Sequence, residues 1–116
     1  MNIVIVGMGE VGRHISRVLV GENHNVVIVD NDPEALASAE ETLDAMVLEG
    51  HAGNSRTLQQ ANVASCDLFV AVTDNSEANM LSAIRAKEMG AKKTIARVAD
   101  PAYFVEDRGI FAGMFD

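Results

Sequence analysis

The first thirty residues, MNIVIVGMGEVGRHISRVLVGENHNVVIVD (1–30), decide the fold class of this chain. An apolar run is followed at once by three glycines, Gly7, Gly9 and Gly12, with the spacing G-x-G-x-x-G. A helical pattern comes next, and a second apolar run ends in Asp30, eighteen positions after the last glycine. A strand, a glycine turn, a helix and a second strand in this order predict a dinucleotide-binding βαβ unit.

Each glycine of the motif meets a different physical requirement. Gly7 allows a tight turn, Gly9 lets the backbone approach a pyrophosphate, and Gly12 lets the helix pack closely on the strand. The following helix directs free N–H groups and its positive dipole end at the phosphates. We therefore predict that the cofactor-binding loop comprises Gly7, Met8, Gly9, Glu10, Val11 and Gly12. The carboxylate of Glu10 makes a triphosphate less favourable there than a dinucleotide, although a side chain turned outward into solvent is the simpler interpretation.

Asp30 stands where a carboxylate can accept hydrogen bonds from ribose hydroxyls. A 2′-phosphate would add negative charge beside it, and the next residues, Asn31 and Asp32, supply no cation. NAD(H) is therefore favoured over NADP(H). An adenine mononucleotide or S-adenosylmethionine would suit the same carboxylate, so the motif leaves these ligands open.

Continuous apolar runs alternate with helical patterns along the whole chain. The runs occupy residues 2–6, 25–30, 45–49, 67–73 and 94–98. Because they are continuous, they predict strands that are buried on both faces. We expect an α/β fold: a Rossmann-like, doubly wound parallel sheet with helices on both faces, forming a single domain over residues 1–116. The sixth strand of such a sheet is expected to be truncated.

Helices are predicted between these strands from apolar side chains at helical spacing. Their apolar faces are expected to comprise Val11, Ile15, Val18 and Leu19, then Leu36, Ala39 and Leu43, and finally Met80, Leu81 and Ile84. Residues suited to helix termini are Asp32 with Pro33, Ser55, Asn75 or Ser76, Gly21, Gly90, and Asp100 with Pro101. Asn79, behind the Asn75 or Ser76 cap, is expected to be solvated.

Residues that follow the strands are further candidate ligand contacts, because the carboxyl ends of strands line the crevice of such a sheet. Thr73 and Asp74 are expected to face the ligand, with a plain capping role as the alternative. His51 is expected either beside an adenine or as an ordinary loop histidine. Arg97 interrupts an apolar run and needs an anionic partner: a nucleotide, a second subunit, or an internal salt bridge with Asp74 or Asp100.

Composition disfavours several other functions. Nine Lys and Arg against seventeen Asp and Glu give a net charge of −8, which opposes nucleic-acid binding. Cys66 has no disulfide partner, which favours a reducing cytosolic setting. We expect no signal peptide or membrane span, no metal site and no enzymatic activity, because the corresponding patterns are missing. The apolar tail, Ile110, Phe111, Met114 and Phe115, is expected to pack on a further strand or a partner subunit.

Five stretches together resemble a known family: "VGMGEVGRHISRVL", "VVIVDNDPE", "VLEGHAGNSRTLQQANV", "DLFVAVTDNSEANMLSAIRAK" and "TIARVADPAY". From residue 2 to about residue 108 the chain is similar to the nucleotide-binding N-terminal domain of Trk-type potassium uptake regulators, called RCK or KTN domains. The stretch T-D-N-S-E-x-N followed by I-A-R-V is the most specific part of the resemblance.

The resemblance implies a cytosolic regulatory subunit at the inner face of the membrane, assembled as a homo-oligomer on a membrane-embedded potassium transporter or channel. It would sense NAD(H), or ATP, ADP or AMP, and would not catalyse a reaction. Carried over, the family's contacts fall on residues 7–11, Asp30, Thr73, Asp74 and Arg97, with His51 near the adenine. The alternatives are the cofactor-binding lobe of an NAD-dependent oxidoreductase and, last, a methyltransferase.

Overall fold

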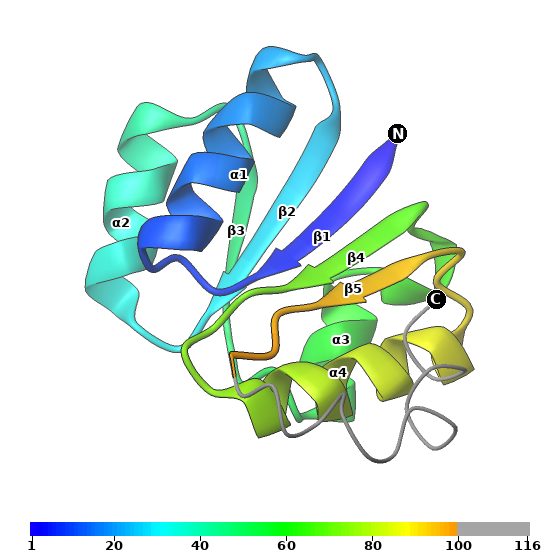
Figure 1. Ribbon diagram of the computed structural model, residues 1–116. Helices are drawn as coiled ribbons and strands as arrows, with labels where there is room; N and C mark the ends of the chain where they lie inside the picture. Colours follow the sequence, from blue (N-terminus) through cyan, green and yellow to red (C-terminus); the bar gives the residue numbers. More distant parts are fainter. Residues whose placement is uncertain (100–116) are drawn as a thin grey trace.

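A parallel sheet of five strands forms the centre of the protein, in a computed structural model that describes residues 1–99 (Figure 1). The strands are β1 (Asn2–Val6), β2 (Asn25–Asp30), β3 (Met46–Glu49), β4 (Leu68–Ala71) and β5 (Thr94–Ala96). Their order in the sheet is β3-β2-β1-β4-β5, so the chain starts in the middle and winds outward in both directions. The predicted α/β, doubly wound parallel sheet is confirmed.

Helices cover both faces of this sheet. The helices are α1 (Glu10–Gly21), α2 (Pro33–Thr42), α3 (Ser55–Gln60), α4 (Ser76–Met89) and the short 3-10 helix η1 (Val63–Ser65). Figure 1 shows α1 and α2 on one face and α3 and α4 on the other. Successive side chains of β1 alternate between the two layers: Ile3 and Ile5 pack in the core cluster of α1 and α2, Val4 and Val6 in that of α3 and α4. Burial on both faces explains why the strand is a continuous apolar run.

The parallel register brings the carboxyl ends of the strands together. Val6 pairs with Val29 of β2 and with Ala71 of β4. Beyond these pairs, main-chain hydrogen bonds continue between residues that leave the sheet, from Gly7 N–H to Val29 O (2.9 Å) and from Arg97 N–H to Ala71 O (2.9 Å). The residues after each strand are therefore held against their neighbours at one edge of the sheet.

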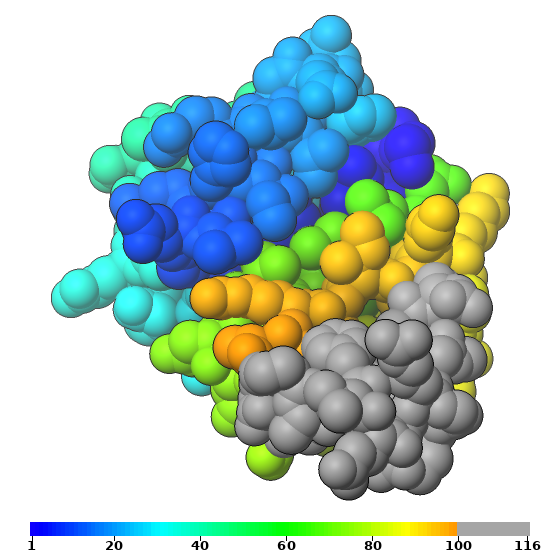
Figure 2. Space-filling model, in the orientation of Figure 1, coloured from blue at the N-terminus to red at the C-terminus, as the bar shows by residue number. Residues whose placement is uncertain are grey.

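The predicted apolar faces of two helices are partly wrong. Val11 and Val18 of α1 and Leu81 of α4 are 37%, 46% and 46% exposed. α1 buries Gly12 and Ser16 instead, and at Gly12 only glycine fits, because a Cβ there would overlap the carbonyl oxygen of Gly7. β5 is an edge strand that α1 does not cover, so Ile95 is 48% exposed. Figure 2 shows atoms of β4 and β5 at the surface next to α1.

Helix termini follow local hydrogen-bonding chemistry. Asp32 caps α2 with Pro33 in the first turn, as predicted, and Asn75 caps α4. The predicted cap of α3 at Ser55 is wrong: the side chain of Asn54 accepts from the N–H of Arg56 (2.8 Å). Asn54 has the extended backbone of a cap, whereas Ser55 is already helical.

Two glycines lie at the C-terminal ends of helices. Gly90 ends α4 with φ of +121°, a conformation suited to glycine, but Gly21 is the last residue within α1, and Glu22 is its cap. The predicted helix start at Asp100 and Pro101, the truncated sixth strand and the apolar tail lie outside the described residues.

Candidate functional site

A cleft of about 710 Å³ lies at the carboxyl ends of the strands. It is bounded by the residues that follow β1, β2, β3, β4 and β5. All of the sequence-predicted site residues except Gly12 line it: Gly7, Met8, Gly9, Glu10, Val11, Asp30, His51, Thr73, Asp74 and Arg97. The structure thus brings together side chains that are up to ninety positions apart in the sequence (7 to 97).

Residues 7–12, here called the glycine loop, comprise the turn after β1 and the first residues of α1, and residues 7–11 form one wall of the cleft. Gly7 has φ of +108°, and a Cβ there would lie 2.9 Å from the backbone nitrogen of Thr73. A Cβ on Gly12 would overlap the carbonyl oxygen of Gly7. Both glycines are therefore required by the fold of the protein itself, and Gly12 acts beneath the cleft as a packing residue.

Gly9 differs from these two glycines. No atom lies within 4 Å of the position that its Cβ would take, and its backbone (φ −72°, ψ −162°) is open to any residue. The fold would therefore admit a side chain at position 9, which would stand in the cleft. Packing within the protein therefore does not require glycine at position 9. Close approach of a ligand to the backbone would require it.

Asp30 joins the glycine loop to the end of β2. Its Oδ2 accepts from the N–H of Met8 (2.7 Å), and its Oδ1 accepts from the N–H of Asp32 (2.9 Å). This half-buried carboxylate therefore has a structural role that the sequence motif does not reveal. A carboxylate offers about four lone-pair sites, so two remain for ribose hydroxyls.

Thr73 is held at the cleft by a buried amide. The N–H and hydroxyl of Thr73 donate to Oδ1 of Asn79 (3.0 and 2.6 Å). The Nδ2 group of Asn79 donates to the carbonyl oxygens of Thr73 (3.0 Å) and Arg97 (2.9 Å). The prediction that Asn79 is solvated is wrong, since its side chain is fully buried. Its spacing to the buried Ala83 and Ala86, four and seven positions on, is the signal that could have placed it on the inner face of α4.

Arg97 lies just after β5, not within a core strand as the sequence suggested, because β5 is an edge strand that ends at Ala96. Its side chain is exposed and lines the cleft. Within residues 1–99 it forms no ion pair, so the alternative of a salt bridge with Asp74 is not realised, and Asp100 lies outside the described residues. A guanidinium at this edge of the sheet that no carboxylate of residues 1–99 neutralises suits an anionic ligand.

The remaining wall comes from residues after β3 and from small side chains. The exposed His51 turns back on its own loop, with Nδ1 accepting from the N–H of Gly53 (3.2 Å). Sequence reasoning did not include several residues that line the cleft: Val6, Asn31, Asp32, Ala35, Gly50, Ala52, Val72, Asn75 and Ala78. Most are small or apolar and carry no chemical signal of their own; they lie at the end of a strand, in the segment after it, or in the first turn of α2 or α4.

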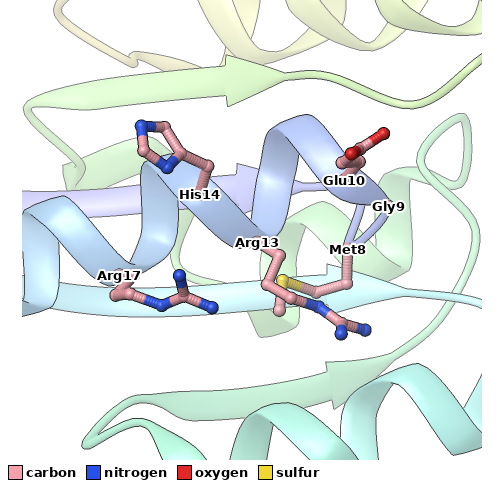
Figure 3. Close-up of a pocket in the computed structure, with 6 residues that line it drawn as sticks. All are labelled: Met8, Gly9, Glu10, Arg13, His14 and Arg17. Atoms are coloured by element: carbon pink, nitrogen blue, oxygen red, sulfur yellow. The ribbon is translucent and has the colours of Figure 1, made fainter.

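A second hollow of about 440 Å³ runs along the first turns of α1. It is lined by Met8, Gly9, Glu10, Arg13, His14 and Arg17. Figure 3 shows the Arg13 and Arg17 side chains extending to the same side of α1, with His14 pointing to the other side. All three side chains are exposed, as predicted for His14. Two arginines one helical turn apart therefore place positive charge beside the glycine loop.

Two further titratable groups lie at the opposite end of β4. Burial raises the pKa of the Cys66 thiol to about 11, with the charge of Asp67 as a smaller contribution. The pKa of Asp67 is lowered, first by the hydrogen bond from the N–H of Asn2 (2.8 Å) and then by Lys92, whose Nζ lies 3.2 Å from the carboxylate. Neither group lines the cleft. No cluster of three or more potential metal ligands occurs within residues 1–99.

The sheet order, the glycine loop and the cleft at the strand ends define a Rossmann-type domain of the nucleotide-binding class. The chain belongs to the TrkA-N domain family, which matches residues 3–110. The resemblance derived from the sequence motifs is thereby confirmed. None of the helices described in residues 1–99 is long and apolar enough to cross a membrane.

Individual relatives agree with this assignment. The Trk system potassium uptake protein TrkA homolog of Methanothermobacter thermautotrophicus is 41% identical over 101 residues, which cover 87% of this chain and 47% of that protein. The chain thus spans about half the length of this curated relative.

Two solved structures are similar in fold. The "GsuK channel bound to NAD" aligns with a TM-score of 0.78 and 22% identity, over 88% of this chain and 18% of that one. The "Shewanella denitrificans Kef CTD in AMP bound form" aligns with a TM-score of 0.78 and 20% identity, over 100% of this chain and 70% of that one.

Proposed function

We propose that this chain is the nucleotide-sensing domain of a regulatory subunit that serves potassium uptake. Membership of the TrkA-N family and the potassium uptake relative support the proposal. The observation that carries it is the cleft itself. The open position at Gly9, the Asp30 carboxylate and Arg97, which forms no ion pair within residues 1–99, all line this one space. These groups match the phosphate, ribose and anion contacts that a nucleotide needs.

The preferred ligand in this proposal is NAD(H), with AMP, ADP and ATP as weaker alternatives. The first N–H groups of a helix lack partners within it, so the start of α1 would hold the pyrophosphate. Asp30 would accept from the adenosine ribose, and Arg97 would neutralise phosphate charge. Asn31 and Asp32 line the same wall and give a 2′-phosphate no cation, which disfavours NADP(H). The NAD-bound and AMP-bound neighbours are consistent with this choice.

Regulation requires only that the ligand bind two arrangements of the assembly with different affinity. We place the domain on the cytoplasmic side, in a homo-oligomer attached to a membrane-embedded potassium transporter or channel. The domain is a sensor in this proposal, and bound nucleotide leaves it chemically unchanged. Binding of NADH and of NAD⁺ with different affinity would make the assembly responsive to the redox state of the cell.

Calorimetry of the purified chain with NADH, NAD⁺, AMP, ADP, ATP and NADPH tests the proposal. We expect NADH and NAD⁺ to bind more tightly than ATP, because Glu10 adds negative charge beside the phosphates, and more tightly than NADPH. Failure of all six to bind at millimolar concentration would contradict nucleotide sensing. Oxidation of NADH by an added carbonyl compound, or reduction of NAD⁺ by an added hydroxy acid, would favour the oxidoreductase alternative instead.

A further inference from the structure

Asn79 is a fully buried polar side chain that contacts two segments of the cleft at once. Its Oδ1 accepts from Thr73, and its Nδ2 donates to the carbonyl oxygens of Thr73 and Arg97, at 2.6 to 3.0 Å. Thr73 belongs to the segment between β4 and α4, whereas Arg97 follows β5. One amide therefore fixes the separation of two cleft walls that come from different strands.

The segment after β5 is also held at other points. Arg97 N–H donates to the carbonyl oxygen of Ala71 (2.9 Å), and the N–H of Ala99 donates to the hydroxyl of Ser76 (3.0 Å). Ser76 and Asn79 both lie in the first turn of α4. The backbone from Arg97 to Ala99 thus rests on the start of α4 next to the Thr73 segment, and the Arg97 side chain leaves from a fixed backbone position.

From this geometry we infer that Asn79 is a positioning residue of the nucleotide site, which acts by holding the Arg97 backbone in register with Thr73 so that the guanidinium meets the ligand's phosphates. The inference rests on the proposed function. Only an amide can fill this place: the site requires an acceptor for the N–H and hydroxyl of Thr73 and a donor for two carbonyl oxygens. Aspartate supplies the acceptor alone, and leucine supplies neither.

The test is a double-mutant cycle in the 116-residue chain, with NADH as the probe and calorimetry as the readout. Asn79→Asp removes the two donated hydrogen bonds and keeps the acceptor oxygens. Arg97→Met removes the guanidinium and keeps a long side chain. Each single variant is expected to weaken NADH binding about tenfold, and the double variant is expected to be within about twofold of the weaker single variant.

Ser82→Ala is the matched control, because Ser82 is equally buried on α4 but its hydroxyl donates only to the backbone of its own helix (3.1 Å to Asn79 O). It should leave NADH affinity within about twofold of the unmodified chain. Thermal unfolding of every variant reports the folded fraction at the titration temperature. Should Asn79→Asp be unfolded there, Asn79→Ala, which introduces no charge, takes its place in the cycle.

Additive losses, with the double variant weakened about a hundredfold, would overturn the inference, because Asn79 would then act independently of Arg97. An unchanged NADH affinity in Asn79→Asp would overturn it as well. Both results leave nucleotide binding by the unmodified chain intact. Failure of the unmodified chain to bind any of the six nucleotides named above would instead contradict the proposed function.

Discussion

Two glycines of the same motif have separable roles. Gly12 is required for packing, since a Cβ there would overlap the carbonyl oxygen of Gly7, whereas a Cβ on Gly9 would meet no atom within 4 Å. The first requirement is present in the protein alone. The second arises only when a ligand occupies the cleft, so substitution at these positions can distinguish folding from binding.

Gly9→Val is expected to abolish measurable NADH binding while lowering the free energy of unfolding by no more than about 1 kcal/mol, the cost of a poorer helix cap. Gly12→Ala is the matched variant, and it is expected to cost about 2 to 4 kcal/mol because the backbone must move to admit the methyl group. Urea unfolding and NADH calorimetry measure the two effects. Normal NADH affinity in folded Gly9→Val would mean that the ligand lies elsewhere.

Asp30 combines a binding role with a structural one. In Asp30→Ala the N–H groups of Met8 and Asp32 lose their acceptor, so both NADH affinity and stability should fall, each by about 1 to 3 kcal/mol. Because the change also removes the negative charge that opposes a 2′-phosphate, NADPH should lose less affinity than NADH. Calorimetry with both dinucleotides gives the ratio. An unchanged NADH to NADPH ratio would remove Asp30 from the ribose site.

At the scale of the elements, Asp67 connects the start of β4 to β1 and to the segment before β5. Its carboxylate accepts from the N–H of Asn2 and pairs with Lys92. Both contacts lower its pKa in the folded protein. A lowered carboxyl pKa gives stability that is fully present above the unfolded pKa of about 4 and is lost as the pH falls through the folded value.

Asp67→Asn should therefore have a lower melting temperature than the unmodified chain at pH 7, and this gap should close as the pH is lowered below about 4. Thermal unfolding between neutral and acid pH measures it. High salt should narrow the gap only partly, because the Lys92 pair is screened and the hydrogen bond from Asn2 remains. A gap that is constant with pH would show that the charged form of Asp67 gives no stability.

Much of the fold was predictable at this scale because a strand buried on both faces leaves a continuous apolar run, as in β1 and β2. β4 and β5 were predicted too long, because the β-branched residues Val72, Thr73 and Val98 suit a strand as well as the residues before them do, although the observed strands end at Ala71 and Ala96. Sequence reasoning placed the glycine loop and Asp30 through their spacing. It missed the burial of Asn79, because a polar residue near a helix start was expected to be solvated, and its spacing to the apolar Ala83 and Ala86 was not used.

At the scale of the whole molecule, the charge distribution opposes the proposed ligand. The chain carries a net charge of −8, and a dinucleotide is itself anionic. Arg13 and Arg17 lie beside the glycine loop on one side of α1 (Figure 3), and Arg97 lines the cleft. These cations lie at the end of the sheet where the ligand would enter, so they offset locally the repulsion from the acidic surface.

The double variant Arg13→Gln and Arg17→Gln is accordingly expected to slow NADH association about threefold to tenfold at low salt, with little change in the dissociation rate. The difference in association rate from the unmodified chain should nearly vanish at about 0.5 M salt, because screening then shortens the range over which the two arginines attract the ligand. Lys92→Gln with Lys93→Gln changes the net charge equally just before β5, at the opposite end of the sheet from the cleft, and controls for net charge. Stopped-flow fluorescence of NADH measures both rates. Equal slowing in the two double variants would mean that total charge, and not the two arginines beside the glycine loop, governs entry of the ligand.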